Sequence, residues 1–282
     1  MLSRIVLDVA LDAAMEKNKS MSYVKAVSLQ GVLMEIIDTE YAEMLHTSTL
    51  HPYSQCVVKN GTNNQWIVNA LDKDAYDRII VPLSRIDAFK ITHDDIDVLV
   101  TNKSITTVSR SELIKKFYFE DSSRYISVSF ITPTSFKSDG RYINYPQISL
   151  LYKSLMNKFD SSSSEDNFMS DELLEELINS TVIERYDLHS CIYNVGRYKI
   201  PSFMGKMVLK INGAQSLVNF ANMLFRFGEY SGIGIKTAMG MGSIKINIVR
   251  RDPRSGRMPY DDVPPTRSGL NAAHQNTERV EK

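Results

Sequence analysis

The glycine-rich segment from Gly228 to Gly242 constrains the fold more than any other part of the chain. It reads GEYSGIGIKTAMGMG and holds five of the 13 glycines found among 282 residues. Glycine has no Cβ and adopts positive φ at low cost, so such a loop turns its N–H groups toward an anion or lets another backbone lie against it. The preceding residues 214–228 have a helical apolar face, and SIKINIV after the loop alternates like a strand. The apolar face consists of Leu217, Phe220, Ala221, Leu224 and Phe225.

Residue spacing and the order of helix, loop and strand exclude two kinds of nucleotide site here. A P-loop requires Gly-Lys-Ser/Thr, whereas Ile235 stands between Gly234 and Lys236. A dinucleotide loop runs from a strand to a helix, which is the reverse of this order. Two interpretations remain open: a clamp for a phosphate backbone, and a glycine-rich turn with a purely structural role.

The first half of the chain predicts one β-α-β-β-α-β unit. Residues 3–11 alternate as a strand, and Ser22 is placed to cap a helix from Tyr23 to about Ile37. The inward side chains of this helix are expected to be Val27, Met34 and Ile37. A short second helical stretch ends at His46, and Asn60-Gly61 predicts a hairpin on which Trp66 packs.

Residues 72–108 complete this unit. DKDAYDRIIVPL predicts a helix that ends at Pro82, because proline cannot donate the backbone hydrogen bond that continues a helix. Strands follow within residues 86–108, where residues 94–108 are also compatible with one long hairpin.

The second half repeats the same order of elements. Strands are expected over residues 124–132, 184–195 and 206–211, and helices over residues 145–159 and 170–178. The connection SSSSEDN between the two helices predicts no packed structure. The chain is therefore expected to be α+β, with two tandem ferredoxin-like (RRM-like) domains over residues 1–120 and 121–250. Residues 251–282 have four prolines and no apolar periodicity, and predict a disordered tail.

Charge is unevenly distributed although the formal net charge is zero. Residues 160–179 carry seven acids and no base, and residues 250–282 carry +2, which leaves +5 on the remainder. A basic face is compatible with a nucleic-acid partner, and solvated scattered charge is the alternative. Cys56 and Cys191 have no metal or redox spacing, and no apolar run has the length of a signal or a membrane span. These features predict a soluble cytoplasmic protein.

Two histidines close together in sequence, His46 and His51, are the candidate catalytic pair. A histidine near neutral pKa both accepts and donates a proton, which is what RNA cleavage without a metal requires. The alternative is that both are surface or structural residues. The residues nearest to a metal set are His93, Asp94, Asp95 and Asp97, and they are expected to form a solvent-facing turn. No metal and no other cofactor are predicted.

Five segments in order resemble the CRISPR-associated endoribonucleases that process pre-crRNA, within the RAMP superfamily. They are LQGVLMEII (residues 29–37), LHTSTLHPYS (residues 45–54), TPTSFK (residues 132–137), IPSFMGKMVLKI (residues 200–211) and the glycine-rich loop. The resemblance covers residues 1 to about 249 and is greatest to members that accompany type III-A (Csm) effector complexes.

The resemblance implies roles for single residues. His46 matches the family's catalytic histidine in its Leu-His motif, and His51 falls where many members carry a lysine. Some members have a catalytic tyrosine where this chain has Met34, whose thioether cannot exchange a proton. His51 is therefore expected to supply that function, with Tyr41 and Tyr53 as nearby alternatives or core residues.

RNA binding requires neutralised phosphates, and cations near the matched motifs are the candidates. Each candidate has the alternative of being an ordinary exposed residue, and Lys236 is favoured by its place among glycines. The predicted RNA-binding residues are Gly232, Gly234, Lys236, Thr237, Gly240, Gly242, Lys137, Arg141, Lys199 and Lys206.

The resemblance implies a metal-independent endoribonuclease that cleaves CRISPR repeat RNA in pre-crRNA by 2′-hydroxyl attack, in antiviral defence. It also implies hand-over of the product to a type III (Csm) effector complex, and leaves a homodimer open. The rival is a non-catalytic RAMP subunit that only holds crRNA, and a third interpretation is an RNA-recognition module unrelated to CRISPR.

Overall fold

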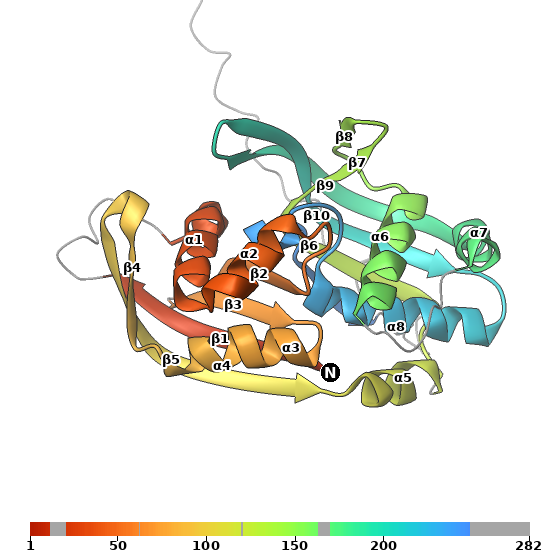
Figure 1. Ribbon diagram of the computed structural model, residues 1–282. Coiled ribbons are helices and arrows are strands. Elements are labelled where there is room, and N and C mark those ends of the chain that lie inside the picture. Colours follow the sequence, from red (N-terminus) through yellow and green to blue (C-terminus); the bar gives the residue numbers. More distant parts are fainter. Residues whose placement is uncertain (12–20, 62, 120, 163–169, 249–282) are drawn as a thin grey trace, which may run out of the picture. The chain divides into compact units, whose positions relative to one another are not determined.

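A computed structural model describes residues 1–11, 21–61, 63–119, 121–162 and 170–248. Met1 to Ile248 form one compact unit, and within its described residues two larger antiparallel sheets and one small hairpin are found (Figure 1). The predicted tail and most of the SSSSEDN connection lie outside the described residues.

The first sheet has the strand order β2-β3-β1-β5-β4. Its strands are β1 (Leu2–Leu11), β2 (Tyr53–Asn60), β3 (Asn63–Ala70), β4 (Ala88–Ile91) and β5 (Ile96–Val108). The predicted hairpin at Asn60-Gly61 joins β2 to β3, and Trp66 is fully buried. Residues 96–108 form one strand that pairs with β1 and β4, so a hairpin within residues 94–108 is the wrong alternative.

Helix α1 (Ala26–Ile36) follows a 3-10 turn over Tyr23–Lys25. Its buried face differs from the prediction, because Val27 and Met34 are only partly buried while Ile37 is buried. Ser22 occupies the N-cap position of the turn but makes no side-chain capping hydrogen bond. Val27 packs instead against a separate cluster that includes Tyr193 and Met241, so this side of the helix faces the second half of the chain. The buried residues of α1 are Ala26, Leu29, Val32 and Leu33.

The helical segment after β3 continues past Pro82, so its predicted end there is wrong. It consists of α3 (Lys73–Ala75), a π-helical turn (Tyr76–Ile80) and α4 (Val81–Arg85). The N–H of Val81 donates to the carbonyl of Tyr76, which is π-helical spacing. This wider turn makes Pro82 one of the first residues of a new α-helical turn, where its missing N–H costs no hydrogen bond.

The second sheet has the strand order β11-β6-β10-β9. Its strands are β6 (Tyr125–Thr134), β9 (Thr181–Val195), β10 (Tyr198–Ile211) and β11 (Ile244–Ile248). Its helices are α6 (Ile148–Ser161), α7 (Asp171–Ser180) and α8 (Gln215–Ser231). An additional hairpin of β7 (Phe136–Ser138) and β8 (Arg141–Ile143) was not predicted. In both sheets the first and third strands of the β-α-β-β-α-β order are central, which confirms the tandem ferredoxin-like fold.

Each of the two larger sheets has its own cluster of buried apolar side chains. One core cluster contains β1, α1 and β3, including Ile5, Leu33 and Trp66, and another contains α6, α8 and β6, including Leu155 and Phe225. Helix α2 (Thr39–Thr47) ends one residue after His46, and helix α5 (Arg110–Tyr118) contacts α8. Because contacts unite residues 1–248, the division into domains near residue 120 stays a prediction. Across the part of the chain described, no helix is both long and apolar enough to cross a membrane.

Candidate active site

The glycine-rich loop after α8 is fixed by groups from both sheets. Gln55 on β2 donates to the carbonyl of Ala238 at 2.8 Å, and the Tyr193 hydroxyl on β9 donates to the carbonyl of Met239 at 2.6 Å. Ala238 is itself part of the core cluster of the first sheet. The loop therefore contacts both halves of the molecule.

Two glycines of the loop have neighbours that belong to the protein. Gly234 has φ 81°, and a Cβ there would overlap the carbonyl oxygen of Ser135; Gly240 has φ 93°, and its Cβ would overlap that of Ala26 on α1. A side chain at either position is excluded by internal packing and strained by positive φ. The structural interpretation explains both glycines without RNA, and the clamp interpretation stays a prediction for the exposed part of the loop.

The buried side chain of Lys158 on α6 holds this loop by hydrogen bonds. No sequence motif predicted this role for Lys158. Its Nζ donates to the carbonyls of Gly232 and Gly234 at 3.1 Å each, and more weakly to Ser231 and Thr237 at 3.4 Å each. The side chain is buried, and burial lowers the pKa of Lys158 to about 7. The available signal was its helical position on the apolar face that also carries Leu155.

Replacing Lys158 by methionine is expected to change how stability depends on pH. Burial lowers the pKa from 10.5 to about 7 in the folded state, so between these values the unfolded chain binds a proton that the folded chain releases. The free energy of unfolding therefore rises with pH above 7, by up to about 1.4 kcal/mol per pH unit. Lys158→Met removes this rise.

Urea unfolding at pH 7, 8 and 9 measures the effect. Lys153→Met is the matched control, because Lys153 is exposed on the same helix. Equal pH slopes for the parent and Lys158→Met would show that the amine stays charged beneath the loop.

A cavity of about 550 Å³ opens beside the loop. Three segments far apart in sequence form its walls: residues 49–51 before β2, the β7–β8 hairpin, and residues 234–239 of the loop. Among the predicted site residues it brings together His51, Lys137, Gly234, Lys236 and Thr237. Tyr142, Lys158 and Tyr198 also line it and were not predicted.

His51 is the histidine that lines this cavity, and its environment perturbs its pKa. Burial lowers the pKa of His51, and the nearby charges of His46 and Lys236 lower it further. Its ring lies 5.7 Å from the Tyr53 ring, and its buried Nδ1 has no hydrogen-bond partner among the described residues. A neutral imidazole at pH 7 is able to accept a proton.

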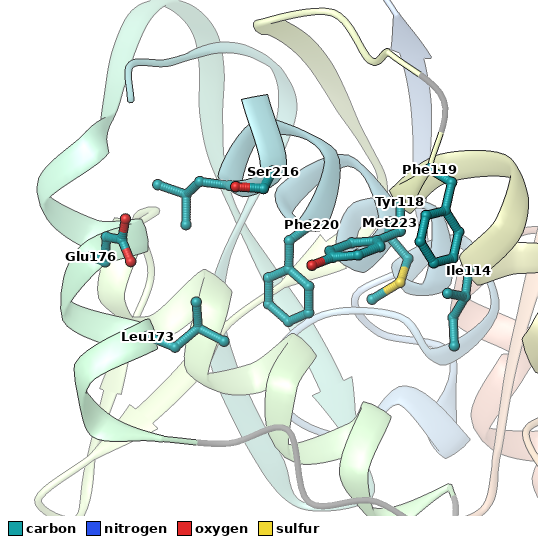
Figure 2. Close-up of a pocket in the computed structure, with 9 residues that line it drawn as sticks. Ile114, Tyr118, Phe119, Leu173, Glu176, Ser216, Phe220 and Met223 are labelled. Atoms are coloured by element: carbon teal, nitrogen blue, oxygen red, sulfur yellow. The ribbon is translucent and has the colours of Figure 1, made fainter. Parts of the chain in front are cut away.

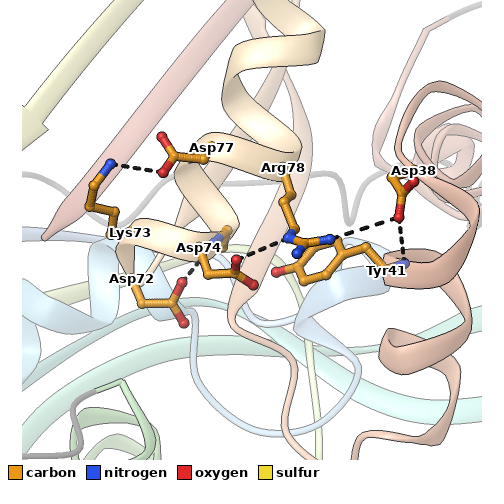
Figure 3. A network of polar contacts seen from close by, with 8 residues as sticks. Asp38, Tyr41, Asp72, Lys73, Asp74, Asp77 and Arg78 are labelled. Atoms are coloured by element: carbon orange, nitrogen blue, oxygen red, sulfur yellow. Dashed lines mark hydrogen bonds and ion pairs between the residues drawn. The ribbon is translucent and has the colours of Figure 1, made fainter.

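His46 is exposed in the last turn of α2 and close enough to His51 to influence its pKa. Figure 3 shows the contacts at the other end of this helix, where Asp38 accepts a hydrogen bond from the Tyr41 N–H at 3.0 Å. Arg78 bridges from Asp38 to Asp74 and lies over the Tyr41 ring. Such exposed ion pairs contribute little each, so buried Tyr41 and its neighbours in the core position α2.

The remaining candidate residues are buried in the core or the loop, or lie outside the lining of this cavity. Tyr41 and Tyr53 are fully buried, and burial raises the pKa of both phenols, which makes them core residues. Met34 packs against the first core cluster. Gly232, Gly240 and Gly242 are buried in the loop, whereas Arg141, Lys199 and Lys206 are exposed on β8 and β10.

A second cavity, of about 390 Å³, lies among α5, α7 and α8. Figure 2 shows Ile114, Tyr118 and Phe119 on one side and Leu173 and Glu176 on the other. Its lining is apolar apart from Ser216 and Glu176, so it provides neither a cation for phosphate nor a histidine for proton transfer. The glycine-loop cavity combines a histidine with lysines, which makes it the candidate active site.

Potential metal ligands do not gather in the described residues: no group of three or more His, Cys, Asp or Glu side chains is placed to hold an ion. The predicted independence from metal stays a prediction.

Comparison with known proteins gives consistent matches. A family model described as "CRISPR-associated endoribonuclease Cas6" matches residues 128–244. A protein of that name from Streptococcus thermophilus is 35% identical over 222 residues, which is 78% of this chain and 90% of the relative. Another, from Mycobacterium tuberculosis, is 30% identical over 248 residues, or 87% of this chain and 78% of the relative.

Solved structures show the same fold. A Cas6 product complex has a TM-score of 0.70 at 17% identity, covering 87% of this chain and 99% of that one. Thermus thermophilus Cas6 has a TM-score of 0.65 at 19% identity, covering 88% and 98%. The structural likeness gives the architecture, and the sequence identity over more than two thirds of the chain gives the family: this protein belongs to the Cas6 family of CRISPR-associated endoribonucleases.

Proposed function

We propose that this endoribonuclease cleaves CRISPR repeat RNA within pre-crRNA at the glycine-loop cavity and so releases guide crRNAs for antiviral defence. The observation that carries the proposal is the position of His51, which is half-buried in a cavity with Lys137 and Lys236 and electrostatically coupled to His46. Relatives solved as a product complex and as a substrate-mimic complex support an RNA substrate.

The reaction needs one proton removed and one proton supplied. The 2′-hydroxyl loses its proton and its oxygen attacks the adjacent phosphorus, while the bond from phosphorus to the 5′-oxygen breaks. The leaving oxygen takes a proton, so the products are a 2′,3′-cyclic phosphate and a 5′-hydroxyl. We assign the base to His51, because its lowered pKa leaves the imidazole unprotonated at pH 7, and the acid to exposed His46.

Cations around the cavity neutralise the phosphates. Lys236 has left-handed φ of 54°, and like Lys137 it is exposed at the cavity wall. Positive groups placed where charge builds up on the phosphorane stabilise the transition state more than the bound substrate. Arg141, Lys199 and Lys206 lie outside the cavity lining, where they contact flanking phosphates in this proposal.

The proposal also covers where cleavage takes place in the cell and what happens to the product. The cytoplasm is the site of cleavage, and the product crRNA passes to a type III (Csm) effector complex. A homodimer is compatible with the proposal but not required by it, because one chain holds every residue assigned to the chemistry.

Cleavage is expected to continue fully in a chelator, because the two histidines move both protons without a metal-bound water. The measurement is incubation of purified protein with a CRISPR repeat RNA in EDTA, followed by mapping of the product ends. A 2′,3′-cyclic phosphate, or its hydrolysis product, and a 5′-hydroxyl are the expected ends.

Two results contradict the proposal in different ways. Activity that disappears in EDTA and returns with magnesium overturns the metal-independent mechanism. Tight binding of the repeat without any cleavage supports instead the rival function, a non-catalytic RAMP subunit that holds crRNA.

A further inference from the structure

Four tyrosines on β8, just after it, and on β9 and β10 are exposed: Tyr198 is 71% exposed, Tyr186 70%, Tyr145 54% and Tyr142 37%. A tyrosine ring left in water forgoes the burial that usually stabilises a large aromatic side chain. Two further observations place these four rings along one path on the surface. The rings line two cavities, and a short segment of the chain joins those cavities.

The four tyrosines line two cavities in pairs. Tyr142 and Tyr198 line the glycine-loop cavity together with His51. Tyr145 and Tyr186 line a separate cavity of about 330 Å³ along the edge strand β9. Each cavity therefore has aromatic side chains from two different segments of the chain.

The connecting segment is the end of β8 and the residues that follow it. Tyr142 lies in β8 at the glycine-loop cavity, and Asn144 and Tyr145 line the cavity beside β9. Three residues of extended chain span about 10 Å, so the two cavities are neighbours along this segment. The hairpin contacts β10, which pairs with β9.

The chemistry of the cavity beside β9 suits a nucleobase. Tyr145 and Tyr186 supply exposed aromatic faces over buried Phe203, while Asn144, His189 and Ser190 supply hydrogen-bonding groups. The Tyr145 hydroxyl accepts a hydrogen bond from Gln147 Nε2 at 2.7 Å, which restrains its ring. Stacking on aromatic side chains is how single-stranded RNA binds without base pairing, and Arg141 on the same hairpin is an exposed cation.

We propose that Tyr198, Tyr142, Tyr145 and Tyr186 form a stacking track for single-stranded RNA that runs from the candidate active site to the cavity beside β9. The proposal rests on the proposed function, because it takes RNA cleavage at the glycine-loop cavity as its starting point. It adds a second binding site, whose ligand is an unpaired nucleobase of the same RNA strand, away from the scissile phosphate.

The test combines changes in the protein with changes in RNA length. Repeat RNA with a 2′-deoxy sugar at the cleavage site is shortened stepwise from each end, and its dissociation constant is measured for the parent and for Tyr145→Leu/Tyr186→Leu. The double variant is expected to bind full-length RNA at least about fivefold more weakly, since stacking on one aromatic contributes about 5- to 150-fold per base. The difference is expected to vanish once the stacked nucleotides have been removed from one end.

Two control variants isolate stacking from other causes. Tyr145→Phe/Tyr186→Phe keeps both rings and is expected to bind within about twofold of the parent. Phe119→Leu alters a side chain that is 73% exposed at the unrelated apolar cavity, and it is expected to bind like the parent. Melting temperatures of all variants verify that these exposed substitutions leave the fold intact.

Several outcomes overturn the track. Parent-like affinity of the double leucine variant at every RNA length does so, as does a loss of affinity that is the same for all lengths. Binding of the parent by a protein partner at these tyrosines, with RNA affinity unchanged in the variant, assigns the surface to protein docking instead. Failure of the parent to cut repeat RNA contradicts the proposed function, whereas the length-dependent affinity difference tests the track separately.

Discussion

His51→Ala is expected to slow single-turnover cleavage of repeat RNA by about 10²- to 10⁴-fold, the usual contribution of a general base or acid. The imidazole is half-buried in the candidate active site, and its lowered pKa keeps it unprotonated near pH 7. Proton transfer contributes to rate and little to binding, so repeat affinity is expected to stay within a few-fold of the parent.

His46→Ala is expected to have a loss of the same order, since both protons must be moved in one reaction. His93→Ala is the matched control, because the His93 side chain is 91% exposed and lies in the turn before β5. The parent's rate is expected to fall on acidification below pH 6.5, as His51 becomes protonated and loses its capacity as base. A variant that binds weakly but cuts normally at saturating RNA reassigns its histidine to recognition.

Most of the fold was predictable because its signals are local. The apolar stripe before the glycine loop, the alternation after it and the Asn60-Gly61 turn each report on a few neighbouring residues. The errors occur where a local rule has an exception. Pro82 continues a helix because the π-helical turn before it removes the need for its N–H.

The β7–β8 hairpin had a usable signal. Asp139 and Gly140 have φ of 49° and 76°, and Asp-Gly is the favoured dipeptide for a hairpin turn with positive φ at both positions. Its strands are only three residues long, so they present no alternation that a periodicity pattern detects. Two of the four proposed stacking residues lie on this hairpin or directly after it.

Residues of the candidate site could be predicted only where they belong to a recognisable sequence motif. His46 and His51 lie in one short segment, and Lys236 lies among glycines, so each was identifiable by pattern. Lys158 and Tyr198 were missed because periodicity states which face of an element is apolar, and not which distant segment packs against it. A cavity built from segments more than 180 residues apart requires the folded chain.

The structure changes how the glycines of the loop are interpreted. The sequence left open a phosphate clamp and a structural turn, and packing against Ser135 and Ala26 gives Gly234 and Gly240 structural reasons. Valine at either position is therefore expected to weaken folding first. The exposed Lys236 is the part of the loop that the proposed function assigns to phosphate contact.

The most direct test of the central claim is a repeat RNA that carries a single 2′-deoxy sugar at the nucleotide before the cut. Without the 2′-hydroxyl there is no nucleophile, so this RNA is expected to bind with the affinity of the all-RNA repeat and to remain intact over times in which the parent RNA is fully cleaved. Deoxy sugars placed one at a time at neighbouring nucleotides are the controls, and these RNAs are expected to be cut. The predicted result is normal binding and no cleavage when the deoxy sugar is at the nucleotide before the cut. Cleavage of this RNA at the same phosphate would contradict attack by the 2′-hydroxyl.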